Sequence, residues 1–382
     1  MGFAFTRGTD MRSSCLLATL LYLMGTAGAP AQTPLRTEGP GLKAHEDSRY
    51  QAEIALCRNH HPVIRNSGAA GGPASPAGPA YAGPAKVSAI PGVIAAAGHW
   101  RSVWHESGNN ADGIVGTPDG VLVAQQDNSD VVLVTADGHA KVVYRDTNTG
   151  GAVSINRQGQ TFLAERGLHQ AIREVAPDRR VLADTIDGDP LDCLGSGGLN
   201  DLTAAANGGV YFTLGNLYYA APGGTVTRQG DVTGTNGIIL SPDEKHLYVT
   251  SGTFGQPGNL VVFDVQPDGM LTHERVLAHL TGSGDGSAVD SEGRIYVSSG
   301  TVIDVIAPDD GRLLGVIPLP QGDDVISLSF GGPGKRTLFA VALNHKFAQG
   351  GLGLPSDHVM GGQGGELVAI RMLARGYPGR AK

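Results

Sequence analysis

The sequence predicts an all-β fold: a six-bladed β-propeller preceded by a disordered or weakly ordered N-terminal extension. Two observations lead to this prediction. The chain has 58 glycines and 22 prolines among 382 residues, and a β-rich pattern recurs six times from about Gly98 onward. Abundant glycine favours short strands joined by tight turns, and 41% apolar residues suffice to build a core. A repeat of this kind is typical of propeller blades.

The first 31 residues have the order of a secretory signal peptide. Arg7 and Arg12 precede a short apolar run, and the small residues around Ala29 and Ala31 resemble a cleavage site. The apolar run is too short to span a bilayer. We therefore expect an exported protein, periplasmic or extracellular.

Residues 32–97 are expected to form an extension and linker. From Ser67 to Lys86 nearly every residue is Gly, Pro, Ala or Ser, which is typical of a segment without a packed core. Before it, Tyr50, Ile54 and Cys57 are spaced i, i+4, i+7 and are expected to line one face of a short helix. In an oxidising compartment Cys57 and Cys193 either form a disulfide or remain two unrelated thiols, and the sequence leaves both possibilities open.

The propeller is expected over residues 98–376, with residues 377–382 as a tail. Copies of the repeat begin 36 to 49 residues apart, and a four-stranded blade needs about 40–45 residues. Their first residues are Asp112, Gly151, Asn200, Asn236, Asp285 and approximately Ile326. A two-sheet sandwich is the alternative, but it does not predict such a repeat. Glu366–Met372 is predicted as the third strand of the last blade. Ser102–His105 is expected to return as its fourth strand and close the ring.

Four repeats begin with an oxygen-bearing side chain: Asp112, Asn200, Asn236 and Asp285. The first strands of propeller blades line the central channel in the same direction, so these residues are expected at one mouth of it. Clustered hard oxygen ligands favour Ca²⁺, with Mg²⁺, Mn²⁺ or Zn²⁺ as substitutes. The alternative is that each Asn-Gly or Asp-Gly pair forms an ordinary turn. Turns, however, are already provided about seven residues later in the repeats, as at Asn207-Gly208.

Several of these segments resemble the senescence-marker-protein/gluconolactonase family. They are Gly198-Leu-Asn-Asp-Leu-Thr, Thr235-Asn-Gly-Ile-Ile-Leu-Ser-Pro-Asp, Asp285-Gly-Ser-Ala-Val-Asp and Phe162-Leu-Ala-Glu-Arg-Gly. The resemblance covers residues 105 to 375. It implies a six-bladed propeller with a divalent metal, usually Ca²⁺, that hydrolyses sugar lactones or related lactones and esters. By this resemblance Asn236 and Asp285 are metal ligands, and Asn200 faces both metal and substrate.

Three departures from the family pattern concern substrate specificity more than the reaction class. Asp112 stands where the family usually has Glu, and Arg166 replaces a histidine after Glu165. Gly198-Leu199 stands where the family often has Arg or Ser-Pro before its Asn-Asp. The expected reaction uses a metal-activated water, with Asp285 as the first candidate base and Glu165 as the second. Glu165 and Asn200 are also expected to bind substrate. A metal-stabilised binding propeller without turnover is the main alternative, and a scaffold held to a partner is another.

The charge balance limits the partners. The formal net charge is −8, with 28 Lys and Arg residues, which excludes the basic surface of a nucleic-acid binder and disfavours anionic membranes. We expect a monomer that acts on a small-molecule lactone or ester.

Overall fold

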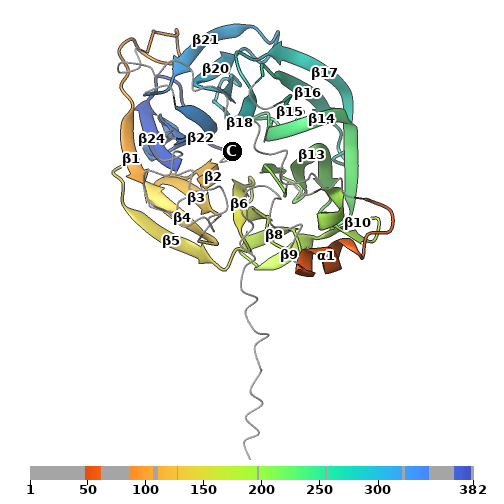
Figure 1. Cartoon of the computed structure of the whole chain (residues 1–382). Helices are drawn as coiled ribbons and strands as arrows, with labels where there is room; N and C mark the ends of the chain where they lie inside the picture. Colours follow the sequence, from red (N-terminus) through yellow and green to blue (C-terminus); the bar gives the residue numbers. More distant parts are fainter. Residues whose placement is uncertain are drawn as a thin grey trace, which may run out of the picture. The chain divides into compact units, whose positions relative to one another are not determined.

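The computed structural model describes residues 48–61, 87–105, 111–126, 128–195, 198–253, 256–320, 323–343 and 365–379. The predicted signal peptide and the linker Ser67–Lys86 lie outside these residues. The described part is almost entirely antiparallel β-sheet, and the sheets stand around a common centre, which confirms the predicted all-β propeller (Figure 1). Within it, no helix is both long and apolar enough to cross a membrane.

Four blades are separate four-stranded sheets. The first contains β2 (Ala111–Gly116), β3 (Gly120–Gln125), β4 (Asp130–Thr135) and β5 (Ala140–Arg145). The second contains β6 (Gly150–Ile155), β7 (Thr161–Glu165), β8 (Ala171–Ala176) and β9 (Arg180–Ala183). Another contains β18 (Gly284–Val289), β19 (Ile295–Ser299), β20 (Val302–Ile306) and β21 (Leu313–Pro318). The last contains β22 (Asp324–Gly331), β23 (Thr337–Leu343), β24 (Gly365–Arg371) and β1 (Arg101–His105).

The expected third and fourth blades are joined into one six-stranded sheet, so the structure has four separate blades and not six. This sheet contains β12 (Leu202–Ala204), β13 (Val210–Ala220), β14 (Val226–Leu240), β15 (His246–Ser251), β16 (Asn259–Val265) and β17 (Leu271–His279). The junction is β14, whose first part pairs with β13 and whose second part pairs with β15. The remaining elements are α1 (Ser48–Ile54), β10 (Thr185–Ile186), β11 (Asp189–Pro190) and the 3₁₀ turns η2 (Leu191–Leu194) and η4 (Pro333–Lys335).

The innermost strands form a closed ring. Neighbours in this ring contact one another in the order β2, β6, β12, β14, β18, β22 and back to β2. The core lies between adjacent sheets: Ile114 packs toward the last blade, with Phe339, whereas Val115 packs toward the second, with Leu163. Burial on both faces explains why these strands are continuously apolar rather than alternating.

The predicted return strand is confirmed. β1 pairs antiparallel with β24, so residues from the beginning of the propeller complete its last blade. Trp104 packs in the core between the first and last blades. Trp100 packs on the neighbouring core, and its indole N–H donates to the Pro318 carbonyl at 2.8 Å. Both tryptophans are packing residues at the closure of the ring.

The N-terminal segment is fastened to the loop before Asn200. A disulfide joins Cys57 to Cys193 with 5.7 Å between their Cα atoms, which decides between the two possibilities left open by the sequence. Next to it, the Asp189 carboxylate accepts main-chain N–H groups from Arg58, Asn59 and His60 at 2.9, 2.7 and 2.8 Å. Burial opposes ionisation of Asp189, but these donors overcome it and lower its pKa to about 2.

A second buried aspartate in this loop behaves in the opposite way. Burial raises the pKa of Asp192 to about 6, although its carboxylate accepts the N–H of Gln170 at 2.9 Å. Gln170 in turn accepts the main-chain N–H of Leu199 through its side-chain oxygen at 2.8 Å. Glu53 of α1 adds its negative charge near Asp192 and pairs with His169 at 3.1 Å. The segment containing α1 is thus connected by short contacts to the residue that precedes Asn200.

Candidate functional site

Three of the predicted metal ligands lie within inner strands, and the fourth lies just before one. Asp112 is in β2, Asn236 is in β14 and Asp285 is in β18, while Asn200 precedes β12 by two residues. Asn200, Asn236 and Asp285 are half-buried. For Asp112 the backbone is described but the side chain is not.

Glycine follows three of these residues because neighbouring inner strands approach too closely for a side chain. A Cβ atom on Gly237 would lie 2.2 Å from the Asp285 carbonyl oxygen. One on Gly113 would lie 2.5 Å from the Ala152 Cα, and one on Gly286 would lie 2.9 Å from the Ile326 oxygen. The Asn-Gly and Asp-Gly pairs therefore belong to packed inner strands rather than to hairpin turns. This packing places Asn236 and Asp285 on adjacent strands at the same level.

Hydroxyl groups on the second strands connect these positions. Thr213 Oγ1 donates to the Asn236 carbonyl at 2.5 Å and accepts the Asp201 N–H at 3.1 Å. Thr250 Oγ1 accepts the Gly237 N–H at 2.7 Å and donates to the Asp285 carbonyl at 3.2 Å. The main chains that carry the candidate ligands are therefore held in register across adjacent sheets.

Sequence reasoning missed these threonines, although the repeat contains a signal for them. Thr213 and Thr250 end the similar segments Val-Tyr-Phe-Thr and Leu-Tyr-Val-Thr, and Ser298 ends Ile-Tyr-Val-Ser. The recurrence of a hydroxyl residue after an aromatic one at the same place in the repeat indicates a shared contact.

The structure offers one observation on metal binding. The side-chain oxygen of Asn236 is buried and has no hydrogen-bond partner. A buried acceptor without a partner is costly unless an ion or water meets it. The main chain of Asp285 lies against Gly237, the residue after Asn236, and a carboxylate and a carboxamide oxygen are both chemically suited to a hard divalent cation. Among the described residues no group of three or more His, Cys, Asp or Glu could hold a metal, so a site here depends on carboxamide oxygens.

Glu165 lies at the end of β7, and its carboxylate is buried. Burial raises its pKa, while a 2.6 Å ion pair with Arg173 opposes that rise. Its neighbour Arg166 donates to the main-chain carbonyl of Asn200. In place of the expected histidine, this position therefore carries a cation that supports the Asn200 main chain.

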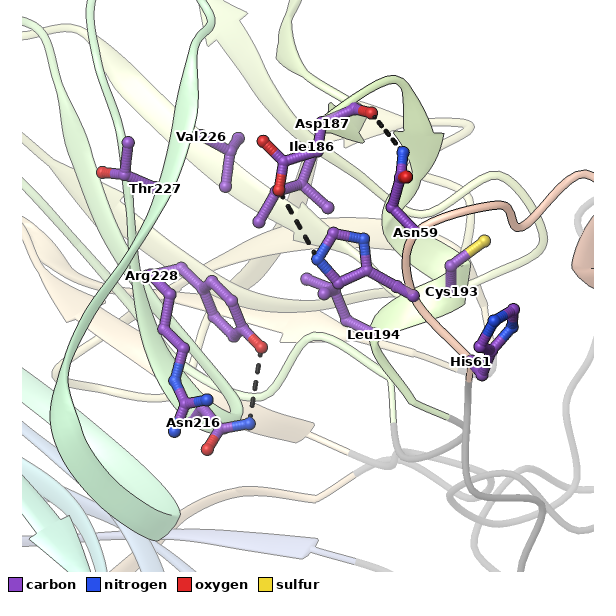
Figure 2. Close-up of a pocket in the computed structure, with 12 residues that line it drawn as sticks. Asn59, His61, Ile186, Asp187, Cys193, Leu194, Asn216, Val226, Thr227 and Arg228 are labelled. Carbon is purple, nitrogen blue, oxygen red and sulfur yellow. Dashed lines mark hydrogen bonds and ion pairs between the residues drawn. The ribbon is translucent and has the colours of Figure 1, made fainter.

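A pocket of about 490 Å³ lies elsewhere, beneath the disulfide-fastened segment (Figure 2). None of the predicted site residues lines it. His60 is in this pocket, with its ring nitrogen 3.3 Å from Asp189. The disulfide and the Asp189 contacts hold the backbone of this segment against the loop.

Comparisons with known proteins agree with the fold. The family described as SMP-30/Gluconolactonase/LRE-like region matches residues 128–344. A gluconolactonase from Zymomonas mobilis is 28% identical over 246 residues, which are 55% of this chain and 66% of that protein. Lactonase drp35 from Staphylococcus aureus is 28% identical over 196 residues, 45% of this chain and 57% of that protein. The matched regions thus span about three fifths of these relatives.

Solved structures show the same architecture. A gluconolactonase from Xanthomonas campestris superposes with a TM-score of 0.58 at 21% identity, covering 78% of this chain and 99% of that one. A calcium-binding protein named regucalcin, from Agrobacterium tumefaciens, superposes with a TM-score of 0.53 at 19% identity, covering 71% and 94% of the two chains. At this level of identity the likeness establishes the fold.

Proposed function

We propose, since the chain belongs to the SMP-30/gluconolactonase/LRE-like family, that it hydrolyses a sugar lactone or a related lactone or ester at the inner-strand residues Asn236 and Asp285. The observation that carries the proposal is the close packing of β14 on β18, which brings Asn236 and Asp285 to adjacent positions. The names of the two lactonase relatives support the reaction class.

This proposal includes a bound divalent metal, and Ca²⁺ is the first candidate. Asn236, Asp285, Asn200 and Asp112 would hold it, and the unpartnered oxygen of Asn236 supports that assignment. The calcium-binding name of the Agrobacterium relative agrees with it. A bound ion would supply positive charge to polarise the lactone carbonyl.

Side chains of the protein would then transfer the proton of the attacking water. The carboxylate of Asp285 takes a proton from water as the water oxygen attacks the carbonyl carbon. The ester C–O bond breaks, the leaving ring oxygen receives a proton, and the product is an open hydroxy acid. The Asn200 carboxamide orients the substrate. Glu165 remains the second candidate for base and for substrate contact, although its carboxylate is engaged with Arg173.

A binding propeller without turnover is the alternative. Two observations favour it: the ion pair that occupies Glu165, and the use of Arg166 to support the Asn200 main chain. Either arrangement leaves fewer free groups for proton transfer than a Glu-His pair would.

The test combines metal analysis with a panel of aldono- and γ-lactones on the disulfide-intact protein. We expect bound Ca²⁺ and measurable turnover, and we expect Asp285→Ala to lower kcat/KM by roughly 100-fold or more. Asn200→Ala should mainly raise KM. Asp309→Ala, which removes the same charge from an exposed turn, serves as the control. Bound Ca²⁺ without turnover on any lactone would instead favour the binding propeller, and absence of metal would favour a scaffold.

We also propose that the protein is exported to the periplasm or the extracellular space. The Cys57–Cys193 disulfide supports this, because such bonds persist in oxidising compartments. N-terminal sequencing of the secreted protein should find residues 1–31 removed.

A further inference from the structure

The pocket beneath the N-terminal segment has no role in the proposed reaction. It lies where β13 pairs with the first part of β14, and residues Asn59–His61 form its other wall (Figure 2). Its volume of about 490 Å³ is within the usual range for small-molecule sites. The wall is held in place by the neighbouring disulfide and by the three N–H groups that Asp189 accepts.

One wall of this pocket presents an uncompensated cation. Arg228 on β14 pairs in register with Tyr218 on β13, so both side chains project from the same face of the sheet. Among the described residues no carboxylate forms an ion pair with Arg228, even though the chain is acidic overall. Arg228 is exposed, so its guanidinium group is open to a ligand in this pocket, and its planar fork is suited to bidentate binding of a carboxylate.

Neighbouring donors extend this wall. The Tyr218 hydroxyl lies 3.4 Å from the side-chain nitrogen of Asn216. Burial raises the pKa of Tyr218, so its hydroxyl keeps its proton and is able to donate.

The opposite wall offers acceptors. The Asp187 carboxylate is 3.6 Å from Nε2 of His60, and its side chain is 69% exposed. The side chain of Asn59 donates to the Asp187 carbonyl at 2.9 Å, which leaves the Asn59 side-chain oxygen available as an acceptor. The pocket therefore combines a carboxylate-binding wall with a wall that accepts hydrogen bonds from hydroxyl groups.

We propose that this pocket binds a small polyhydroxylated carboxylate, with Arg228 on the carboxylate and Asp187 and Asn59 on the hydroxyls. A neutral sugar would form no charge-assisted contact with Arg228, and an apolar acid would make no use of the acceptors on Asp187 and Asn59. The inference goes beyond the lactonase proposal and does not depend on it.

The test uses isothermal titration of the disulfide-intact protein with D-gluconate. D-sorbitol is the matched neutral probe, because it has the same carbon chain without the carboxylate. We expect gluconate to bind, and sorbitol to bind at least about tenfold more weakly. Arg228→Gln should weaken gluconate binding by about 10- to 100-fold, as expected for loss of a charge-assisted contact. Arg312→Gln, an exposed arginine of another blade, should bind gluconate like the wild type.

A second variant separates this pocket from the inner-strand site. Asp285→Ala should keep the gluconate affinity of the wild type if the ligand is bound at Arg228. Loss of binding in Asp285→Ala with normal binding in Arg228→Gln would place gluconate at the inner strands and overturn the proposal. Absence of gluconate binding to the wild type would overturn it as well. Equal binding of glycine, with the same dependence on Arg228, would refute the assignment of the acceptor wall to hydroxyls.

Discussion

Replacing Asp192 by Asn should stabilise the protein at neutral pH. Asp192 is 1% exposed, and its burial raises the pKa to about 6 from an ordinary value of 3.8. The Gln170 N–H opposes this rise and the charge of Glu53 adds to it. The native and unfolded pKa values differ by about 2 units. At a pH above both of them, keeping the carboxylate ionised in the native state therefore lowers the free energy of unfolding by about 3 kcal/mol.

The sign of the pH dependence follows from the raised pKa. The native state binds the Asp192 proton more tightly than the unfolded chain does. The stabilisation from this proton is therefore complete below pH 3.8 and is lost as the pH rises through about 6. An Asn side chain is neutral throughout, and its oxygen is still able to accept the Gln170 N–H. The variant should match the wild type near pH 3.5 and exceed it by up to about 3 kcal/mol at pH 7.5.

Guanidinium chloride unfolding of both proteins at the two pH values provides the measurement. Asp189→Asn is the matched control and should behave in the opposite way, because the native pKa of Asp189 is lowered to about 2. That variant should be less stable than the wild type at pH 7.5, with the deficit shrinking as the pH falls from 3.8 toward 2. If Asp192→Asn is less stable than the wild type at pH 7.5, or if its effect is the same at both pH values, the reasoning is refuted.

Two other changes test the described contacts. Replacing Cys57 and Cys193 by Ser removes a cross-link between residues 136 apart, and the free energy of unfolding should fall by up to about 5 kcal/mol. The reduced wild type should behave like this variant. An unchanged denaturation midpoint would show that the bond does not constrain the unfolded chain. Gly237→Ala places a methyl group against the Asp285 carbonyl, so the free energy of unfolding should fall by about 1–3 kcal/mol and the Ca²⁺ affinity should fall with it. Thermal melts with and without Ca²⁺ measure both quantities. Wild-type values of both would contradict the close packing of β14 on β18.

The propeller could be predicted because its repeat is visible in the sequence. The phase of that repeat places Asn236 and Asp285 at equivalent positions, and the structure has them on adjacent inner strands. The joining of the third and fourth repeats could not be predicted in the same way. Gly230 and Gly234 suggest turns between strands, but both adopt positive φ inside the continuous strand β14. Glycine permits this local irregularity without ending the strand.

The pocket residues were beyond the reach of sequence patterns for a different reason. Arg228 and Tyr218 meet through strand register, and His60 reaches Asp189 across 129 positions of the chain. Neither contact belongs to the repeat, so no periodicity indicates it. The disulfide was recognisable only as one of two possibilities, since two cysteines in a sequence do not report their distance.

The pairing of β1 with β24 also has a consequence for biosynthesis. The two strands are separated by about 260 residues, so at typical elongation rates β24 is made roughly 13 to 52 s after β1. Until then the hydrogen-bonding edge of β1 has no partner in its final sheet. Such an edge readily pairs with other chains. Protection of β1 by chaperones before the chain is complete would therefore favour its native pairing with β24.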